Sequence, residues 1–177
     1  MNEATEFIRY TTLWRIERFK NDQDFKNKKI YALADAMAAF KVPQITEFKG
    51  NCMLNEGLNE LFTILCTTSS GTKFNSANSY IGIGDDATAA DPSQTGLQAA
   101  VNKVYISMDP GYPTYGTLQK AIWHCTATFL VGNFAWNEFT VANGGSDAAK
   151  NLNRKVSAQG TKLSGQIWTC ALSITFA

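Results

Sequence analysis

The spacing of apolar residues changes along this chain, and the change predicts two kinds of structure. Over residues 3–19, 26–40 and 53–66, apolar side chains recur every three or four positions, which is typical of amphipathic helices. From residue 79 onward the apolar period is two, as expected for strands that bury one face. The sequence therefore predicts a helical N-terminal part followed by a β module.

Two long strands dominate the predicted β module. In residues 121–129 and 167–176, large apolar side chains alternate with threonine, serine and other small residues, so one face of each strand points inward. With the shorter strands expected after residue 79, they are enough for an antiparallel β-sandwich or a jelly-roll-like module. We expect its core to contain Trp123, Phe129, Trp168, Leu172 and Phe176. The shorter strands are expected at residues 44–49, 79–84, 101–108, 134–142 and 153–158.

The predicted domain boundary lies at residue 49. We expect residues 1–49 to form a helical extension for attachment or oligomerisation, and residues 50–177 to form the β-sandwich module with the helix 53–66 packed on it. The two N-terminal helices carry more apolar surface than a short extension can bury by itself, so we expect them to pack against another subunit. The alternative is that both helices fold back onto their own sheet. The candidate interface residues are Phe7, Leu13, Trp14, Ile30, Leu33, Met37 and Phe40.

Composition narrows the class of protein. The chain has 177 residues and a hydrophobic fraction of 45%, enough for one domain with a substantial core. Its formal net charge of +1 gives no strong field, so we expect neither nucleic acid nor an anionic membrane as a partner. No stretch approaches the roughly 18 apolar residues of a membrane span. The first residues lack the pattern of a signal peptide, which predicts a protein made and used in a cytoplasm.

Residues suited to catalysis are sparse. His124 is the only histidine, and alternation places it on the opposite face of its strand from the neighbouring Cys125, so the two cannot form a catalytic pair. Glu138 has no second carboxylate nearby in the sequence, and we expect it to form an ion pair with Arg154 or Lys155 instead. We therefore predict no catalytic residues, no enzyme activity and no cofactor.

The four cysteines leave two alternatives open. Their spacing indicates neither a zinc ribbon nor a redox pair, so they are either small buried thiols or partners in one or two disulfides formed outside a reducing cell. The alternation of the long strands puts Cys125 and Cys170 on inward faces, where they could pair. Cys52 and Cys66 form the other candidate pair.

One loop carries a candidate metal site. Asp85, Asp86 and Asp91 lie within a short polar stretch and could hold calcium together with backbone oxygens. The spacing does not match an EF-hand, because no glycine occupies the sixth place and no glutamate closes the loop. A turn stabilised by aspartate side chains is the favoured interpretation, so we expect no bound metal.

Five sequence blocks have a recognisable order. The blocks are GNCMLNEGLN at 50–59, YIGIGDDATAADPSQTGL at 80–97, NFAWNEF at 133–139, NLNRK at 151–155 and GTKLSGQIW at 160–168. Through these blocks, over about residues 48–177, the chain resembles a family of small phage virion proteins. The resemblance brings no known catalytic residues.

This resemblance implies a non-enzymatic structural protein of the virion, assembled in the host cytoplasm. A capsid decoration, cement or minor capsid component is the first expectation, and a tail, neck or fibre-attachment protein is the alternative. The implied partners are other virion proteins and further copies of this chain. A third hypothesis, from another class, is a carbohydrate-binding module, for which Tyr112 and Tyr115 are the candidate aromatic residues.

Overall fold

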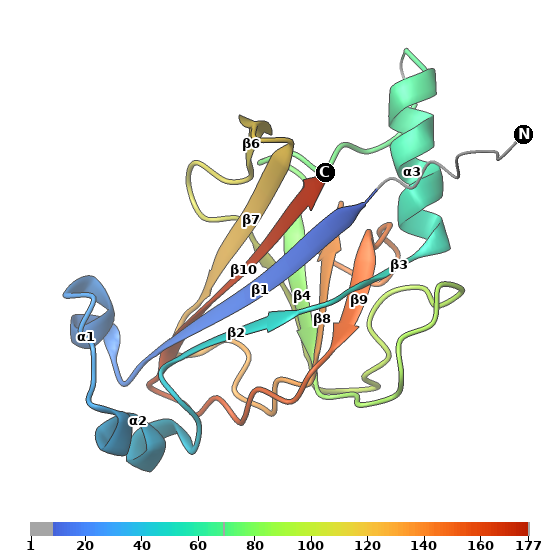
Figure 1. Ribbon diagram of the computed structural model, residues 1–177. Helices are drawn as coiled ribbons and strands as arrows, with labels where there is room; N and C mark the ends of the chain where they lie inside the picture. The colour runs from blue at the N-terminus through green and yellow to red at the C-terminus, as the bar shows by residue number, and fades with distance from the viewer. Residues whose placement is uncertain (1–8, 69, 177) are drawn as a thin grey trace, which may run out of the picture.

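The computed structural model describes residues 9–68 and 70–176, and these form two antiparallel five-stranded sheets in the arrangement of a β-sandwich (Figure 1). The first sheet has the strand order β2 (Ile45–Lys49), β1 (Tyr10–Phe19), β10 (Ile167–Phe176), β7 (Lys120–Ala127) and β6 (Thr114–Thr117). The second has the order β3 (Cys52–Met53), β9 (Asn153–Val156), β8 (Glu138–Ala142), β4 (Tyr80–Gly84) and β5 (Lys103–Ser107). The predicted mainly β, antiparallel class is confirmed.

Three helices are attached to the two ends of the sandwich. Helices α1 (Asp22–Lys26) and α2 (Leu33–Phe40) follow β1 at one end, and α3 (Asn55–Cys66) projects from the other end (Figure 1). The predicted helix over 53–66 is therefore confirmed, and the one over 26–40 is confirmed only in its second half. α1 forms where the sequence suggested a break, because the Asn21 side chain caps it by accepting the Asp24 N–H at 2.8 Å.

The core lies between the sheets and is built largely from aromatic residues. Trp168 contacts Trp136 edge-to-face, with ring centroids 4.9 Å apart, and both are fully buried. Trp123 and Leu172 are buried as predicted. Phe129 and Phe176 are not, with 48% and 47% of their surface exposed. The reason is that β7 ends at Ala127, and that Phe176 is the last residue of β10 at the open end of the sandwich.

β1 is the largest departure from the sequence prediction. Residues 10–19 are a strand, so the predicted helix is wrong there, and the remainder of that helix, residues 3–8, lies outside the described residues. β1 pairs with β10 along its whole length, from Tyr10 opposite Phe176 to Phe19 opposite Ile167. Since β2 pairs with β1, both strands belong to the first sheet. The segment before residue 49 is therefore part of the sandwich from β1 onward, and not a helical extension.

A buried arginine explains why the strand pattern of β1 was missed. Arg18 points inward with Trp14 and Ile16, at a position where an alternating strand normally carries an apolar side chain. Its guanidinium donates to Pro43 O at 3.0 Å and Gln159 O at 2.8 Å and lies 4.7 Å from the Trp168 ring centroid. Burial lowers the pKa of Arg18 to about 10, which leaves it charged at neutral pH.

The inward cysteines face each other across two neighbouring strands. Cys125 on β7 is directly opposite Cys170 on β10, and both are buried free thiols. Burial raises the pKa of both thiols, so they stay protonated at neutral pH. Cys52 and Cys66 are also free. The shared inward face is confirmed, and none of the considered disulfides is formed.

Candidate interaction surface

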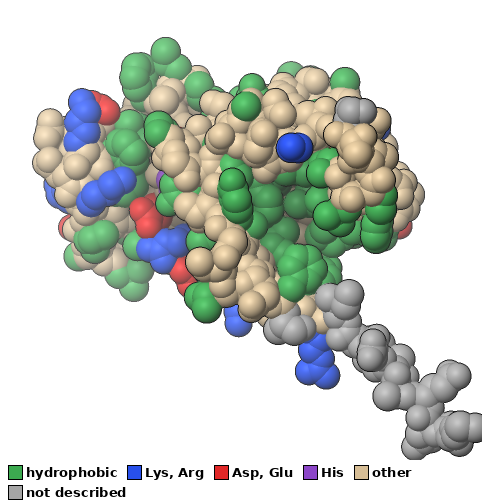
Figure 2. Space-filling model, turned by 90° about the horizontal axis from the view of Figure 1, so that it is seen from above, with side chains coloured by type: hydrophobic (Ala, Val, Ile, Leu, Met, Phe, Trp, Pro, Cys, Tyr) green, Lys and Arg blue, Asp and Glu red, His purple; other side chains and the backbone are tan. Residues whose placement is uncertain are grey.

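One end of the sandwich carries a concentration of exposed apolar side chains. On α3, Phe62 is 64% and Leu65 77% exposed, which is unusual for large hydrophobic residues. Figure 2, which views this end from above, shows hydrophobic side chains gathered in a hollow. Contiguous patches of this kind mark interaction sites in soluble proteins. We call this surface the apolar end and define it by its exposed members, Tyr10, Leu58, Phe62, Leu65, Tyr115, Leu118 and Phe176.

The first half of α3 is attached to the sandwich, up to Leu61, which packs against the core. Gly57 packs so tightly that a Cβ there would lie 2.4 Å from the Leu152 Cα, and the Glu56 carboxylate accepts the Asn151 N–H at 3.0 Å. Leu54, just before the helix, is fully buried. The sequence predicted that the whole apolar stripe lies on the β module. Instead, the stripe is exposed from Phe62 onward and projects from the body of the protein.

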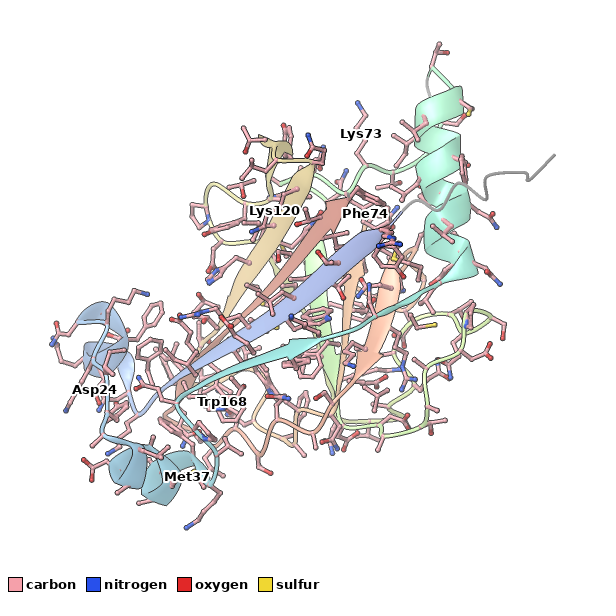
Figure 3. All side chains as sticks on the ribbon, in the orientation of Figure 1. Asp24, Met37, Lys73, Phe74, Lys120 and Trp168 are labelled. Atoms are coloured by element: carbon pink, nitrogen blue, oxygen red, sulfur yellow. The ribbon has the colours of Figure 1, made fainter. Side chains whose placement is uncertain are left out.

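An apolar groove lies beside α3 at the same end. A cavity of about 300 Å³ is lined by residues of both sheets and of α3, including Met53, Leu61, Trp123 and Ile174. A second hollow of about 390 Å³ shares Met53, Leu61 and Phe176 with it. Among the labelled residues of Figure 3, Phe74 lines the groove, and Lys73 and Lys120 lie at the same end. The groove therefore offers an apolar surface with basic side chains nearby.

The β6–β7 hairpin contributes an exposed leucine at a strained position. Its two turn residues, Leu118 and Gln119, have φ values of 55° and 49°, the left-handed conformations of a two-residue hairpin turn. Asn-Gly is favoured in such turns, and leucine at positive φ costs about 1–2 kcal/mol. Unfavourable backbone conformations persist where the surroundings or the function require them. No sequence signal pointed to Leu118.

The predicted interface residues separate into three groups. Phe7 lies outside the described residues. Trp14 and Phe40 are buried in this chain's own fold and Leu13 is half-buried, so the prediction of an interface is wrong for Trp14 and Phe40. Three exposed side chains remain available for contacts, namely Ile30, Leu33 and Met37, of which Met37 is labelled in Figure 3.

The aspartates proposed for calcium point to separate protein partners. Asp86 pairs with the Arg154 guanidinium at 2.9 Å, whereas Asp85 accepts from the Asn102 amide at 2.7 Å and Asp91 from Ser93 N at 2.8 Å. Among the described residues, no group of three or more His, Cys, Asp or Glu side chains could hold a metal ion. The interpretation as a turn stabilised by its own aspartates fits this geometry.

The predicted Glu138–Arg154 ion pair is confirmed and forms the centre of a buried network. Arg154 Nε lies 2.7 Å from Glu138 Oε2, and both side chains are fully buried. Glu138 also accepts the backbone N–H groups of Gln98 at 3.0 Å and Ala99 at 2.7 Å. Arg154 further donates to Thr88 O at 2.8 Å, so the two side chains hold the loop between β4 and β5.

His124 and Cys125 lie on opposite faces of β7, as the alternation predicted. Cys125 is buried between the sheets, and the half-buried His124 faces outward, where its Nδ1 lies 2.7 Å from Asp109 Oδ2.

No helix within residues 9–68 and 70–176 is long and apolar enough to cross a membrane.

Comparison with known proteins gives no relative. No protein-family model, no curated protein and no solved structure matches this chain.

Proposed function

We propose that this protein is a non-enzymatic structural subunit of a virion, a capsid decoration, cement or minor capsid component. The observation that carries the proposal is the apolar end. The exposed side chains of Phe62, Leu65 and Leu118 do not stabilise a free monomer, whereas a subunit that binds a partner buries them. The resemblance of the sequence blocks to phage virion proteins supplies the kind of particle. As part of this proposal, we infer that the sandwich is of the jelly-roll-like type.

The partner at the apolar end is another protein subunit of the particle, either a different virion protein or a further copy of this chain. A projecting helix with an apolar stripe is suited to packing against another helix or into a groove. Lys73 and Lys120 at the same end favour a partner surface with acidic residues around its apolar centre. Ile30, Leu33 and Met37, at the opposite end of the sandwich, are a second candidate contact.

A pair of substitutions on α3 tests the role of the apolar end. We expect Phe62→Gln and Leu65→Gln, alone and combined, to change the free energy of unfolding by less than about 0.5 kcal/mol, because both side chains are exposed. Each is expected to weaken self-association or binding to purified particles at least about tenfold, since burying one such side chain contributes roughly 1.5–3 kcal/mol. Sedimentation velocity and co-sedimentation with particles measure these effects.

The matched control is Val101→Gln, because Val101 is 83% exposed in the loop between β4 and β5, outside the apolar end. It should leave both stability and association unchanged. Equal association of the wild type and the α3 variants would refute the role of the apolar end. Absence of the protein from purified particles by mass spectrometry would refute the virion assignment. Its location by cryo-electron microscopy decides between capsid and the alternative of tail, neck or fibre attachment.

A further inference from the structure

The outward face of the first sheet carries a polar groove that the proposed function does not use. The groove encloses about 260 Å³, which is room for a single ring-sized ligand. Its lining differs chemically from that of the apolar groove, because it combines charged, hydroxyl and aromatic groups. The residues that matter are Arg15, Glu17, Tyr112, His124, Thr169 and Ala171.

One side of the groove is held by Asp109. Its Oδ2 lies 2.7 Å from His124 Nδ1 and accepts the Thr126 hydroxyl at 2.7 Å. Burial acts to raise the pKa of Asp109, but the hydrogen bonds from His124 and Thr126 outweigh it and lower the pKa, so the group is an ionised acceptor at neutral pH. Nδ1 of His124 is then the donor in this contact, and Nε2 is the ring nitrogen that remains to bond a ligand.

An aromatic ring is fixed beside this histidine. Tyr112 stacks on His124 with ring centroids 4.9 Å apart and planes inclined by 26°. The loop that carries Tyr112 is attached to β7, because Asp109 N–H donates to His124 O at 2.9 Å and Tyr112 N–H donates to Asp109 O at 3.1 Å. The aromatic and imidazole groups are therefore positioned before any ligand arrives.

The charges on the other side of the groove are already paired. The Arg15 guanidinium donates to Glu17 Oε1 at 2.9 and 2.8 Å and to Glu47 Oε1 at 2.7 Å. With Asp109 added, carboxylates outnumber the arginine, which disfavours an anionic ligand. A cationic ligand would in turn have to displace the donors that each carboxylate already has. The groove is therefore matched to a neutral ligand rich in hydroxyl groups.

Thr169 supplies a hydroxyl group to the lining of the groove. The residue as a whole is only 2% exposed, so its side chain is held in place by its neighbours. A ligand hydroxyl seated in the groove would hydrogen-bond to it.

We propose that this groove binds a neutral carbohydrate residue, a site additional to the apolar end. The apolar face of the sugar ring packs on Tyr112 and Ala171, while its hydroxyls bond to Thr169, to Nε2 of His124 and to the Arg15–Glu17 pair. Of the two tyrosines that the sequence offered for this role, Tyr112 lines the groove and Tyr115 does not.

Two variants and one control test the site by NMR titration of the full chain with neutral mono- and disaccharides, each at about 50 mM, enough to detect a Kd near 10 mM. We expect at least one sugar to shift the resonances of His124 and its neighbours. Thr169→Val should reduce that affinity roughly three- to tenfold, because valine keeps the shape of the side chain and removes only the hydroxyl that bonds the ligand. Tyr112→Ala should reduce affinity at least about tenfold. Tyr115→Ala, an exposed tyrosine outside the groove, should leave it unchanged.

Three results would overturn the proposal. The first is the absence of any shift at the groove with every neutral sugar. The second is sugar binding that both Thr169→Val and Tyr112→Ala leave intact, which would place the site elsewhere. The third is binding confined to a charged probe, such as methylammonium or inorganic phosphate, which would assign the groove to an ion.

Discussion

The Arg154 network and the apolar end differ in which side chains they bury. The network buries charged groups, and the apolar end exposes hydrophobic ones. In the network, Arg154 and Glu138 are withdrawn from water completely, and each is satisfied by several partners within 3.1 Å. At the apolar end, Phe62 and Leu65 are left in water with no cover from the sandwich. The first arrangement stabilises this chain's own fold. The second does not stabilise the fold, and under the proposed function a partner subunit buries it.

The five sequence blocks contribute differently to the Arg154 network and to the apolar end. The blocks at 80–97, 133–139 and 151–155 meet in the network, which joins Asp86 and Gln94 to Glu138 and Arg154. Gly84 belongs with them, since a Cβ there would lie 2.3 Å from Glu138 Oε1. Phe62, Leu65, Tyr115 and Leu118 lie outside every block. These three blocks therefore describe how the sandwich is held together, whereas the apolar end lies outside the blocks except for Leu58, in the block at 50–59.

The largest effect is expected inside the network. Glu138→Gln removes the charge that compensates Arg154, and breaking a buried pair in this way should reduce the free energy of unfolding by about 3–5 kcal/mol. Glu47→Gln removes an exposed partner of Arg15 and should cost no more than about 1 kcal/mol. Urea denaturation of both variants measures the contrast. If Glu138→Gln cost as little as Glu47→Gln, the network would not be what holds the loop.

A second buried cation should produce a smaller, pH-dependent effect. Lys162 is fully buried and donates only to neutral oxygens, Thr128 O at 2.8 Å and Asn133 Oδ1 at 2.6 Å. Burial lowers the pKa of Lys162 from 10.5 to about 8. Between these two values the unfolded chain binds the additional proton, so this lysine makes stability rise with pH, by up to about 3 kcal/mol.

Comparison with Lys162→Met isolates that contribution from other titrating groups. The difference in unfolding free energy, wild type minus variant, should increase from pH 8 to pH 10.5 and stay constant below pH 7. Chemical denaturation at a series of pH values measures it. A difference that stays flat or falls with pH would mean that Lys162 keeps its ordinary pKa in the fold.

A smaller change in stability, with the opposite sign, is expected in the β6–β7 hairpin at the apolar end. Replacing Leu118-Gln119 by Asn-Gly puts residues suited to positive φ into the hairpin turn and should stabilise the fold by about 1 kcal/mol. The same change removes an exposed apolar side chain, so association should weaken although the subunit is more stable. Lys41→Gly relieves another positive φ, 61° at the end of α2, and should stabilise without affecting association.

Measurement of melting temperature and sedimentation on these two variants separates strain from contact. Unchanged association of the Asn-Gly variant would show that Leu118 is merely exposed and has no part in binding.

The alternation in β7 and β10 was sufficient to predict the class of fold, because large apolar residues at every second position can be buried only as strands of a sheet. The same pattern correctly assigned Cys125 and His124 to opposite faces. It failed for β1, since Arg18 occupies an inward position whose partners, Pro43 and Gln159, are distant in the sequence. The apolar stripe of α3 was visible too, but not the fact that the sandwich covers it only as far as Leu61.

The sequence by itself thus determined the mainly β class, the faces of the long strands and the absence of a long apolar span. Periodicity and local turn chemistry depend on residues close together in the sequence, so they can be recognised from a single sequence. Only the tertiary structure decided that β1 lies beside β10, that Arg154 takes Asp86 as a partner, and that Tyr112, His124 and Thr169 share one groove. These depend on which distant segments meet, and that follows from the packing of the whole chain rather than from any local pattern.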